Sequence, residues 1–164
     1  MHFLKLLSIT AVAIVLAGCG DSKPGKAGES SSTPKVTAGS QLGELGPQGL
    51  FDAVQPGWHS AQPAKYPESL TVDFQIPREV QFIGLLQQEG QPTRAPKSLR
   101  IEISSDGKTW TAVGGSENAC APNIPDGWFN IDLAKPITAQ HMKIVIFSNC
   151  GDAQLLTLRG LRVG

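Results

Sequence analysis

The sequence has no excess of charge of either sign and few aromatic residues. Lys and Arg together number 14, Asp and Glu also number 14, and Phe, Trp and Tyr make up only 6% of the 164 residues. Without a basic surplus, the chain lacks the charged stripe of a nucleic-acid-binding protein and the polybasic patch of a membrane-surface protein. We therefore expect no nucleic-acid partner.

Catalytic motifs are also missing. The chain has no His-Glu-x-x-His, no Gly-x-Ser-x-Gly and no phosphate-binding glycine loop. Neither His59 nor His141 has an evident nucleophile beside it in the sequence. Acidic residues such as Asp73 and Glu102 fall on outward positions of expected strands, where a solvated charge is ordinary. The sequence favours a binding protein over an enzyme.

No stretch repeats its apolar residues with the 3.6-residue period of a helix, and there is no internal repeat. Short segments of alternating or apolar residues are separated instead by turn residues, which is typical of a β protein. A chain of 164 residues has room for one such core. We expect an all-β, antiparallel jelly-roll sandwich of about eight strands. The clearest expected strands cover residues 69–76, 80–88, 98–104, 128–133, 142–148 and 155–163, the last with a bulge at Gly160.

The clearest local pattern is a hairpin in residues 98–113. Leu99, Ile101 and Ile103 alternate with polar residues, which indicates a strand with one buried face. Asp106-Gly107 then suits a tight turn. We expect Trp110, which follows, to join Trp58 in the core. The polar loop 89–97 should then lie at the other end of the same strand.

The first residues are typical of a targeting segment. Lys5 precedes an apolar run over residues 6–15 that is too short to span a bilayer. Leu16-Ala17-Gly18-Cys19 then resembles a bacterial lipobox. We expect a lipoprotein signal peptide at residues 1–18 and lipid on Cys19, the alternative being an ordinary signal peptide with a cysteine nearby.

Residues 19–48 contain few apolar side chains, so we expect a disordered tether there and a folded domain at residues 49–164. This organisation predicts a location in the bacterial cell envelope, with the domain in the periplasm or at the surface. The lipid anchor would be its only contact with a membrane. Asp21 is one position later than an inner-membrane retention signal requires, so an outer membrane is favoured in a Gram-negative cell and the choice stays open.

Two cysteines, Cys120 and Cys150, remain after Cys19 is assigned to lipid. An exported protein meets an oxidising compartment, so a disulfide between them is expected. The alternative, a metal or redox pair, lacks the close Cys-x-x-Cys spacing.

The order of motifs resembles that of the discoidin domains, also called coagulation-factor type C domains, of the galactose-binding-like superfamily. The resemblance implies an eight-stranded jelly roll with ligand loops at one end. Its members bind glycans, lipid headgroups or proteins, and rarely catalyse reactions as isolated domains. The motifs that carry it are Trp58-His59-Ser60, Leu70-Thr71-Val72-Asp73-Phe74, the Ser-x-Asp-Gly-x-x-Trp run from Ser104 to Trp110, and residues 128–133 and 142–149.

In sugar-binding members of this family, a His, an Arg and an Asn donate to sugar hydroxyls while an aromatic ring stacks on the sugar. The alternatives are a structural role for His59 at the edge of the core, a solvated loop charge at Arg94, and ordinary turn chemistry at Asn149 and Asp152. The candidate ligand-binding residues are Arg94, His59, Asn149, Asp152 and Trp128.

Many members also hold calcium in an Asp-Gly-x-x-x-Thr-x-Trp loop. This chain has Ala53 in place of the glycine, lacks the threonine, and offers no glutamate near the last strand. Asp52 is therefore the one candidate metal ligand, although calcium prefers six to eight oxygens. We expect no cofactor, with calcium left open.

Taken with the resemblance, the sequence predicts a lipid-anchored, exported binding module that recognises a carbohydrate through loops at one end of the sandwich. The alternative is an envelope-assembly lipoprotein that uses the same domain to dock a protein. The expected partner is thus a glycan or an envelope protein.

Overall fold

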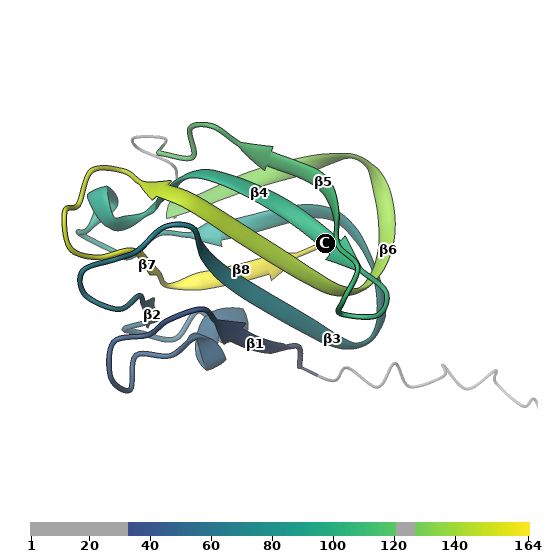
Figure 1. Ribbon diagram of the computed structural model, residues 1–164, viewed down its shortest axis with the longest axis horizontal. Coiled ribbons are helices and arrows are strands. Elements are labelled where there is room, and N and C mark those ends of the chain that lie inside the picture. The colour runs from purple at the N-terminus through teal and green to yellow at the C-terminus, as the bar shows by residue number, and fades with distance from the viewer. Residues whose placement is uncertain (1–32, 121–126) are drawn as a thin grey trace, which may run out of the picture. The chain divides into compact units, whose positions relative to one another are not determined.

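The computed structural model describes residues 33–120 and 127–164 (Figure 1). The predicted signal peptide at residues 1–18 and the predicted lipid site at Cys19 lie outside the described residues. Within the described ranges, no helix is long and apolar enough to cross a membrane. The strands are β1 (Lys35–Ala38), β2 (Trp58–His59), β3 (Glu68–Leu86), β4 (Pro96–Ser104), β5 (Thr111–Ser116), β6 (Trp128–Asn149), β7 (Thr157–Leu158) and β8 (Gly160–Val163), and the 3-10 helices are η1 (Pro47–Asp52) and η2 (Pro92–Arg94).

The long strands β3 and β6 each contribute to both layers of the sandwich. Residues 68–73 of β3 pair with 141–146 of β6, and residues 78–86 pair with 128–139, with a register shift between the two blocks. The sheet order is β1-β3-β6-β4-β5, and β8 also pairs with β3. All these pairings are antiparallel, so the predicted antiparallel sandwich is confirmed. The sequence located the right segments but divided two continuous strands into four.

The core lies between these layers. Leu70, Val72 and Phe74 from the first half of β3 are at most 1% exposed, as their alternation predicts. They belong to the same buried cluster as Ile83 from the second half of β3 and Ile144 from β6. Burying each such side chain contributes about 1.5–3 kcal/mol, so this cluster supplies the main driving force for folding.

The folded domain begins earlier than the sequence predicts. Strand β1 pairs with residues 70–73 of β3 and buries Val36. The hydroxyl of Ser40 donates to the Glu68 carboxylate, and its backbone carbonyl accepts from Nε1 of Trp58 at 2.9 Å. The prediction of a disordered tether is therefore wrong for residues 33–48. An edge strand needs only backbone pairing and one buried side chain, so low hydrophobicity does not exclude it.

The hairpin between β4 and β5 forms, but its turn is longer than predicted. Oδ1 of Asp106 accepts from the backbone N–H groups of Lys108 and Thr109, each at 2.8 Å. Strand β5 therefore resumes only at Thr111, and Trp110 precedes it. The prediction that Trp110 is in the core is wrong: its ring is half-buried with Nζ of Lys143 3.8 Å from its centroid. Trp58, in contrast, is fully buried as expected.

The other end of β4 carries most of the irregular structure, and we call it the loop end (Figure 1). It comprises η2, the two-stranded sheet of β2 and β7, and residues 149–156. The predicted last strand, 155–163, is in fact two strands, because β7 pairs with β2 whereas β8 pairs with β3. The predicted disulfide between Cys120 and Cys150 is confirmed, with 5.6 Å between their Cα atoms.

A candidate ligand-binding site at the loop end

An ion pair joins two loops at this end. Nε of Arg94, in η2, donates to Oδ2 of Asp152 at 3.1 Å, and the two side chains are 26% and 18% exposed. Two backbone hydrogen bonds run in parallel: Asp152 N–H donates to the Thr93 carbonyl at 3.1 Å, and Cys150 N–H to the Ala95 carbonyl at 3.0 Å. The sequence-predicted residues Arg94 and Asp152 are thus brought together, and they neutralise each other.

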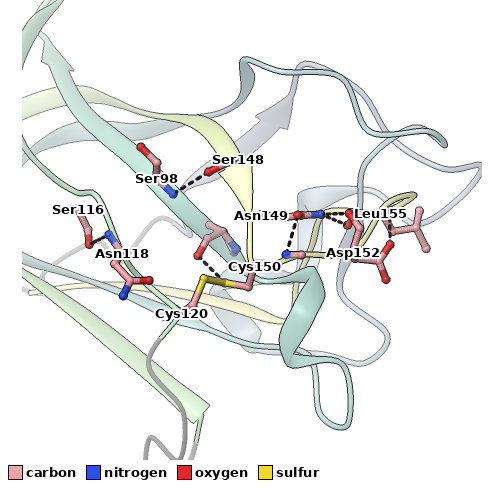
Figure 2. The surroundings of a disulfide bond; sticks show 11 residues. Ser98, Ser116, Asn118, Cys120, Ser148, Asn149, Cys150, Asp152 and Leu155 are labelled. Atoms are coloured by element: carbon pink, nitrogen blue, oxygen red, sulfur yellow. Dashed lines mark hydrogen bonds between the residues drawn. A yellow bond between two sulfur atoms is a disulfide. The ribbon is translucent and has the colours of Figure 1, made fainter.

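The turn after β6 engages both the amide nitrogen and the amide oxygen of Asn149 (Figure 2). Its Nδ2 group donates to the carbonyls of Asp152 at 2.7 Å and Leu155 at 2.8 Å, and its Oδ1 accepts from Gly151 N–H at 3.0 Å. Oδ1 of Asp152 accepts from the N–H groups of Gln154 and Leu155, both at 2.8 Å. These N–H groups, and then Arg94, hold the pKa of Asp152 below its usual value. Both side chains therefore hold the turn, and their predicted contacts with a ligand stay a prediction.

His59 lies in β2, opposite Thr157 of β7, and is 8% exposed. Burial first, and the positive charge of Arg94 second, hold its pKa below the usual value, so the imidazole is neutral at pH 7. Its Nε2 atom is buried and has no hydrogen-bond partner among the described residues, and the same is true of the Thr157 hydroxyl. A buried polar atom of this kind favours a partner, because leaving it without one costs about 1–3 kcal/mol.

A cavity of about 570 Å³ opens at the same end, where β3 and β6 meet η2. Gln88 Oε1 and Arg159 Nε, from two of its lining residues, are buried without a partner in the described structure. Nη1 of Arg159 lies 3.6 Å from Glu89 Oε2, so charge is paired here as well. The lining residues are Gln87, Gln88, Glu89, Gly90, Pro92, Gly127 and Arg159.

All four unpartnered buried side-chain atoms of the described structure therefore belong to β2, to β7 or to residues next to the cavity. Of these, the Gln88 amide oxygen and the Arg159 guanidinium N–H belong to the cavity lining, and they supply one acceptor and one donor. Such a set suits a small polar ligand with several hydroxyl groups. A volume of about 570 Å³ lies within the usual range for ligand pockets.

Trp128 follows Gly127 of the cavity lining, but one face of its ring is covered. The guanidinium carbon of Arg162 lies 4.3 Å from the ring centroid, and its Nη2 donates to Oδ1 of Asn130 at 3.0 Å. Tyr66, which the sequence analysis did not select, offers the more open ring. It is 38% exposed, and its pKa is raised by burial and by the charge of Asp152.

The loop after η1 offers calcium few side-chain ligands among the described residues. The carbonyls of Leu50 and Gly49 accept N–H groups from Ala53 and Val54, which keeps them inside the turn. Gly160 leaves the space for Ala53: a Cβ on that glycine would lie 3.1 Å from the Ala53 Cβ. No group of three or more His, Cys, Asp or Glu side chains in the described residues could hold a metal, and Asp52 belongs to none. Apolar packing holds this loop.

Gln88, Thr157 and Arg159 could not be predicted as site residues from the sequence, for two reasons. Gln88 lies at the end of the expected strand 80–88, next to the polar loop 89–97. A single amide side chain belongs to no sequence motif that would mark it as a ligand-binding residue. Thr157 and Arg159 lie in a segment whose pattern predicts one continuous strand. The structure interrupts this strand at Arg159, whose N–H donates to Leu86 O at 2.9 Å.

Several solved structures similar to this chain are carbohydrate-binding modules. One is CpGH89CBM32-5 from Clostridium perfringens, in complex with GalNAc-β-1,3-galactose: TM-score 0.64, 19% identity, covering 79% of this chain and 94% of that one. The family 32 module of NanJ from C. perfringens, in complex with galactose, has a TM-score of 0.63 and 18% identity, and the match covers 79% of this chain and 92% of that one. Chitosan-binding module 1 from a Paenibacillus sp. IK-5 chitosanase/glucanase has a TM-score of 0.65 and 19% identity, and the match covers 82% of this chain and 96% of that one. At these identities the likeness establishes the fold.

No curated protein matches the sequence. The model of the F5/8 type C domain, in contrast, matches residues 30–157. That span includes β1, which agrees with the early start of the folded domain. The resemblance seen in the motifs is thereby confirmed, and this chain belongs to the F5/8 type C, or discoidin, domain family.

Proposed function

We propose that this protein is a lipid-anchored, exported carbohydrate-binding module without catalytic activity, and that it holds a neutral sugar in the loop-end cavity. The observation that carries the proposal is the cavity itself, with unpartnered Gln88 Oε1 and Arg159 Nε at its lining. Two of the similar solved structures, CpGH89CBM32-5 and the NanJ module, hold the neutral sugars GalNAc-β-1,3-galactose and galactose.

Hydrogen-bonding chemistry supports a sugar. An amide oxygen accepts from a sugar hydroxyl, whereas a guanidinium N–H donates to one. Buried donors and acceptors discriminate strongly for a ligand that satisfies them, because other ligands leave them unpaired. Gln88 and Arg159 are then the principal contacts.

The charges at this end favour an uncharged sugar. Arg94 is paired with Asp152, and Arg159 lies near Glu89. His59 carries no charge at pH 7 because its pKa is lowered. A uronate or a protonated amino sugar would therefore lose hydration without gaining an unpaired opposite charge.

Support for the anchor comes from the sequence. Lys5, the short apolar run and Leu16-Ala17-Gly18-Cys19 have the order that lipoprotein processing needs, and a disulfide suits an exported protein. Expression in a bacterium fed labelled palmitate tests this proposal. The native chain should carry label in the membrane fraction, and a Cys19→Ser variant should carry none; label in both would exclude lipid at Cys19.

A second candidate function is the docking of an envelope protein by the same surface. It is favoured by one observation: none of the described residues that line the cavity is aromatic, although stacking rings are common in sugar sites. Under this alternative, a specific envelope protein would co-purify with the chain, and sugars would not displace it.

Calorimetry with a panel of sugars separates these possibilities. Galactose, N-acetylgalactosamine, galacturonic acid and a chitosan oligomer are titrated into the full chain in detergent. We expect one of the neutral sugars to bind and Gln88→Ala to weaken it by roughly tenfold or more, as one lost buried hydrogen bond implies. Gln81→Ala, on an exposed part of β3, is the matched control. No heat from any sugar would contradict the proposal.

A further inference from the structure

The outer surface of β4, β5 and β6 carries a hollow that the loop-end site does not use. Phe147 of β6 is 40% exposed, although its neighbours Ile144 and Ile146 are fully buried in the core. Beside it lies a cavity of about 380 Å³, which shares no residue with the cavity at the loop end. Its lining residues, which we call the Phe147 groove, are Leu99, Arg100, Gly114, Gly115, Ser116, Glu117 and Phe147.

A glycine in β5 makes room for this groove. Gly115 pairs with Arg100 of β4 and provides no side chain beside it. A Cβ at this position would lie 2.4 Å from the Leu99 carbonyl oxygen and 3.2 Å from the Arg100 Cα. Glycine is therefore required where the two strands approach, and the space next to Arg100 remains open.

The chemistry of the groove suits a sugar ring. The Arg100 guanidinium carbon lies 5.2 Å from the Phe147 ring centroid, and its Nη2 pairs with Glu102 at 2.8 Å. Ser116 Oγ accepts from Asn118 N–H at 3.1 Å and can still donate its own hydrogen. The groove thus combines a partly exposed aromatic ring, one face of which carries the paired Arg100 guanidinium, with a hydroxyl and a carboxylate.

The strand ends that form the groove walls are fixed. The Ser98 hydroxyl donates to Glu117 at 3.1 Å, and its N–H donates to the Ser148 hydroxyl at 3.3 Å. Three residues beyond Glu117, Cys120 is bonded to Cys150, three residues beyond Phe147 (Figure 2). Because both walls are held in place, a ligand would bind without first ordering them.

We propose that the Phe147 groove is a second carbohydrate subsite, which takes another neutral sugar unit of the polymer held at the loop end. The proposal rests on the proposed function, since it assumes that the first site binds a sugar. Two sites on one domain would bind a polysaccharide more tightly than either binds a single sugar, because the second contact is intramolecular.

The experiment compares the full chain and its variants on a polysaccharide and on a single sugar. Retention in gels containing galactan measures the first, and calorimetry with galactose measures the second. Phe147→Ala and Ser116→Ala should reduce affinity for galactan roughly tenfold or more and leave galactose binding unchanged. Ile76→Ala, which truncates another exposed side chain, should change neither. Thermal melting of each variant checks the fold.

Each remaining outcome decides against the subsite. Galactose and galactan binding by a Phe147→Ala variant that matches the native chain would overturn it and leave the proposed function intact. Equal loss on both ligands would indicate a structural role for Phe147. A dimer that Phe147→Ala disperses would identify the groove as an interface between two copies. No binding of galactose or galactan by the native chain would overturn this inference, and the proposed function would then rest on the other sugars of the calorimetry panel.

Discussion

Arg94 and Asp152, 58 residues apart in sequence, meet at 3.1 Å and join the η2 loop to the turn after β6. Asp152 also accepts two backbone N–H groups, whereas Arg94 has only the pair. The two residues should therefore contribute unequally to stability.

Asp152→Ala should lower the free energy of unfolding by about 1–3 kcal/mol, because it leaves two N–H groups and a guanidinium without their acceptor. Arg94→Ala should cost about 0–1 kcal/mol, as expected of a partly exposed ion pair. Urea unfolding of both variants measures the difference. Equal losses would show that the ion pair, and not the turn, is what Asp152 provides.

The disulfide should stabilise the domain chiefly by restricting the unfolded chain. The two cysteines are 30 residues apart, and a loop of that size corresponds to about 3–4 kcal/mol. The free energy of unfolding of the double variant Cys120→Ser, Cys150→Ser should therefore be lower by that amount, as measured by urea unfolding. Reduction of the native protein with dithiothreitol is the control and should match it. Unchanged unfolding midpoints would show that the bond is not formed in the purified protein.

Acid should destabilise the protein in two steps. The pKa of His59 is lowered from 6.5 in the folded protein. Just below pH 6.5 the unfolded chain therefore binds a proton at His59 more readily than the folded chain does, and stability falls as the pH drops. The pKa values of Asp106 and Asp152 are lowered from 3.8, so the stability they add above that value is lost below it. Thermal melting against pH measures both steps.

A His59→Gln variant should lose the first of these steps and keep the second. His141→Gln, which alters the other histidine of the described residues, should keep both. If His59→Gln retains the full dependence between pH 6.5 and 5, the assignment of that step to His59 is wrong.

Calcium should not stabilise this domain, in contrast to family members with a complete calcium loop. A ligand that binds only the folded state raises the melting temperature, by more the further its concentration exceeds the dissociation constant. Because the loop that contains Asp52 lacks a set of metal-binding side chains, melting in 5 mM CaCl2 and in EDTA should coincide. A clear upward shift with calcium would show that backbone carbonyls form a site without further carboxylates.

Much of the fold could be predicted because strand alternation is a local property. Leu70, Val72 and Phe74 were correctly placed in the core on spacing alone. The continuity of β3 and β6 was not visible, because residues such as Ile76, 54% exposed, sit where the strand changes layer. Strand β1 was missed because its pairing depends on backbone atoms, which every sequence offers. Trp110 was misplaced because the Asp106 side chain extends the turn.

The candidate site was less predictable than the fold. Arg94, Asp152, Asn149 and His59 were chosen by resemblance, and the structure gathers them at one end, but it engages three of them in the turn and the ion pair. Gln88 and Arg159 became candidates only when the cavity and their unpartnered atoms were known. Such atoms depend on long-range packing, which no local pattern encodes.

The most direct test of the central claim follows backbone amide signals of the protein during titration with galactose and N-acetylgalactosamine. If a neutral sugar binds as proposed, the largest shifts will fall on residues 87–90, Gly127 and Arg159, and Gln88→Ala will raise the sugar concentration needed for them roughly tenfold or more. If neither sugar moves these signals at concentrations that saturate a weak site, or if the shifts fall only on the hairpin turn at Asp106, the loop-end cavity is not a sugar-binding site.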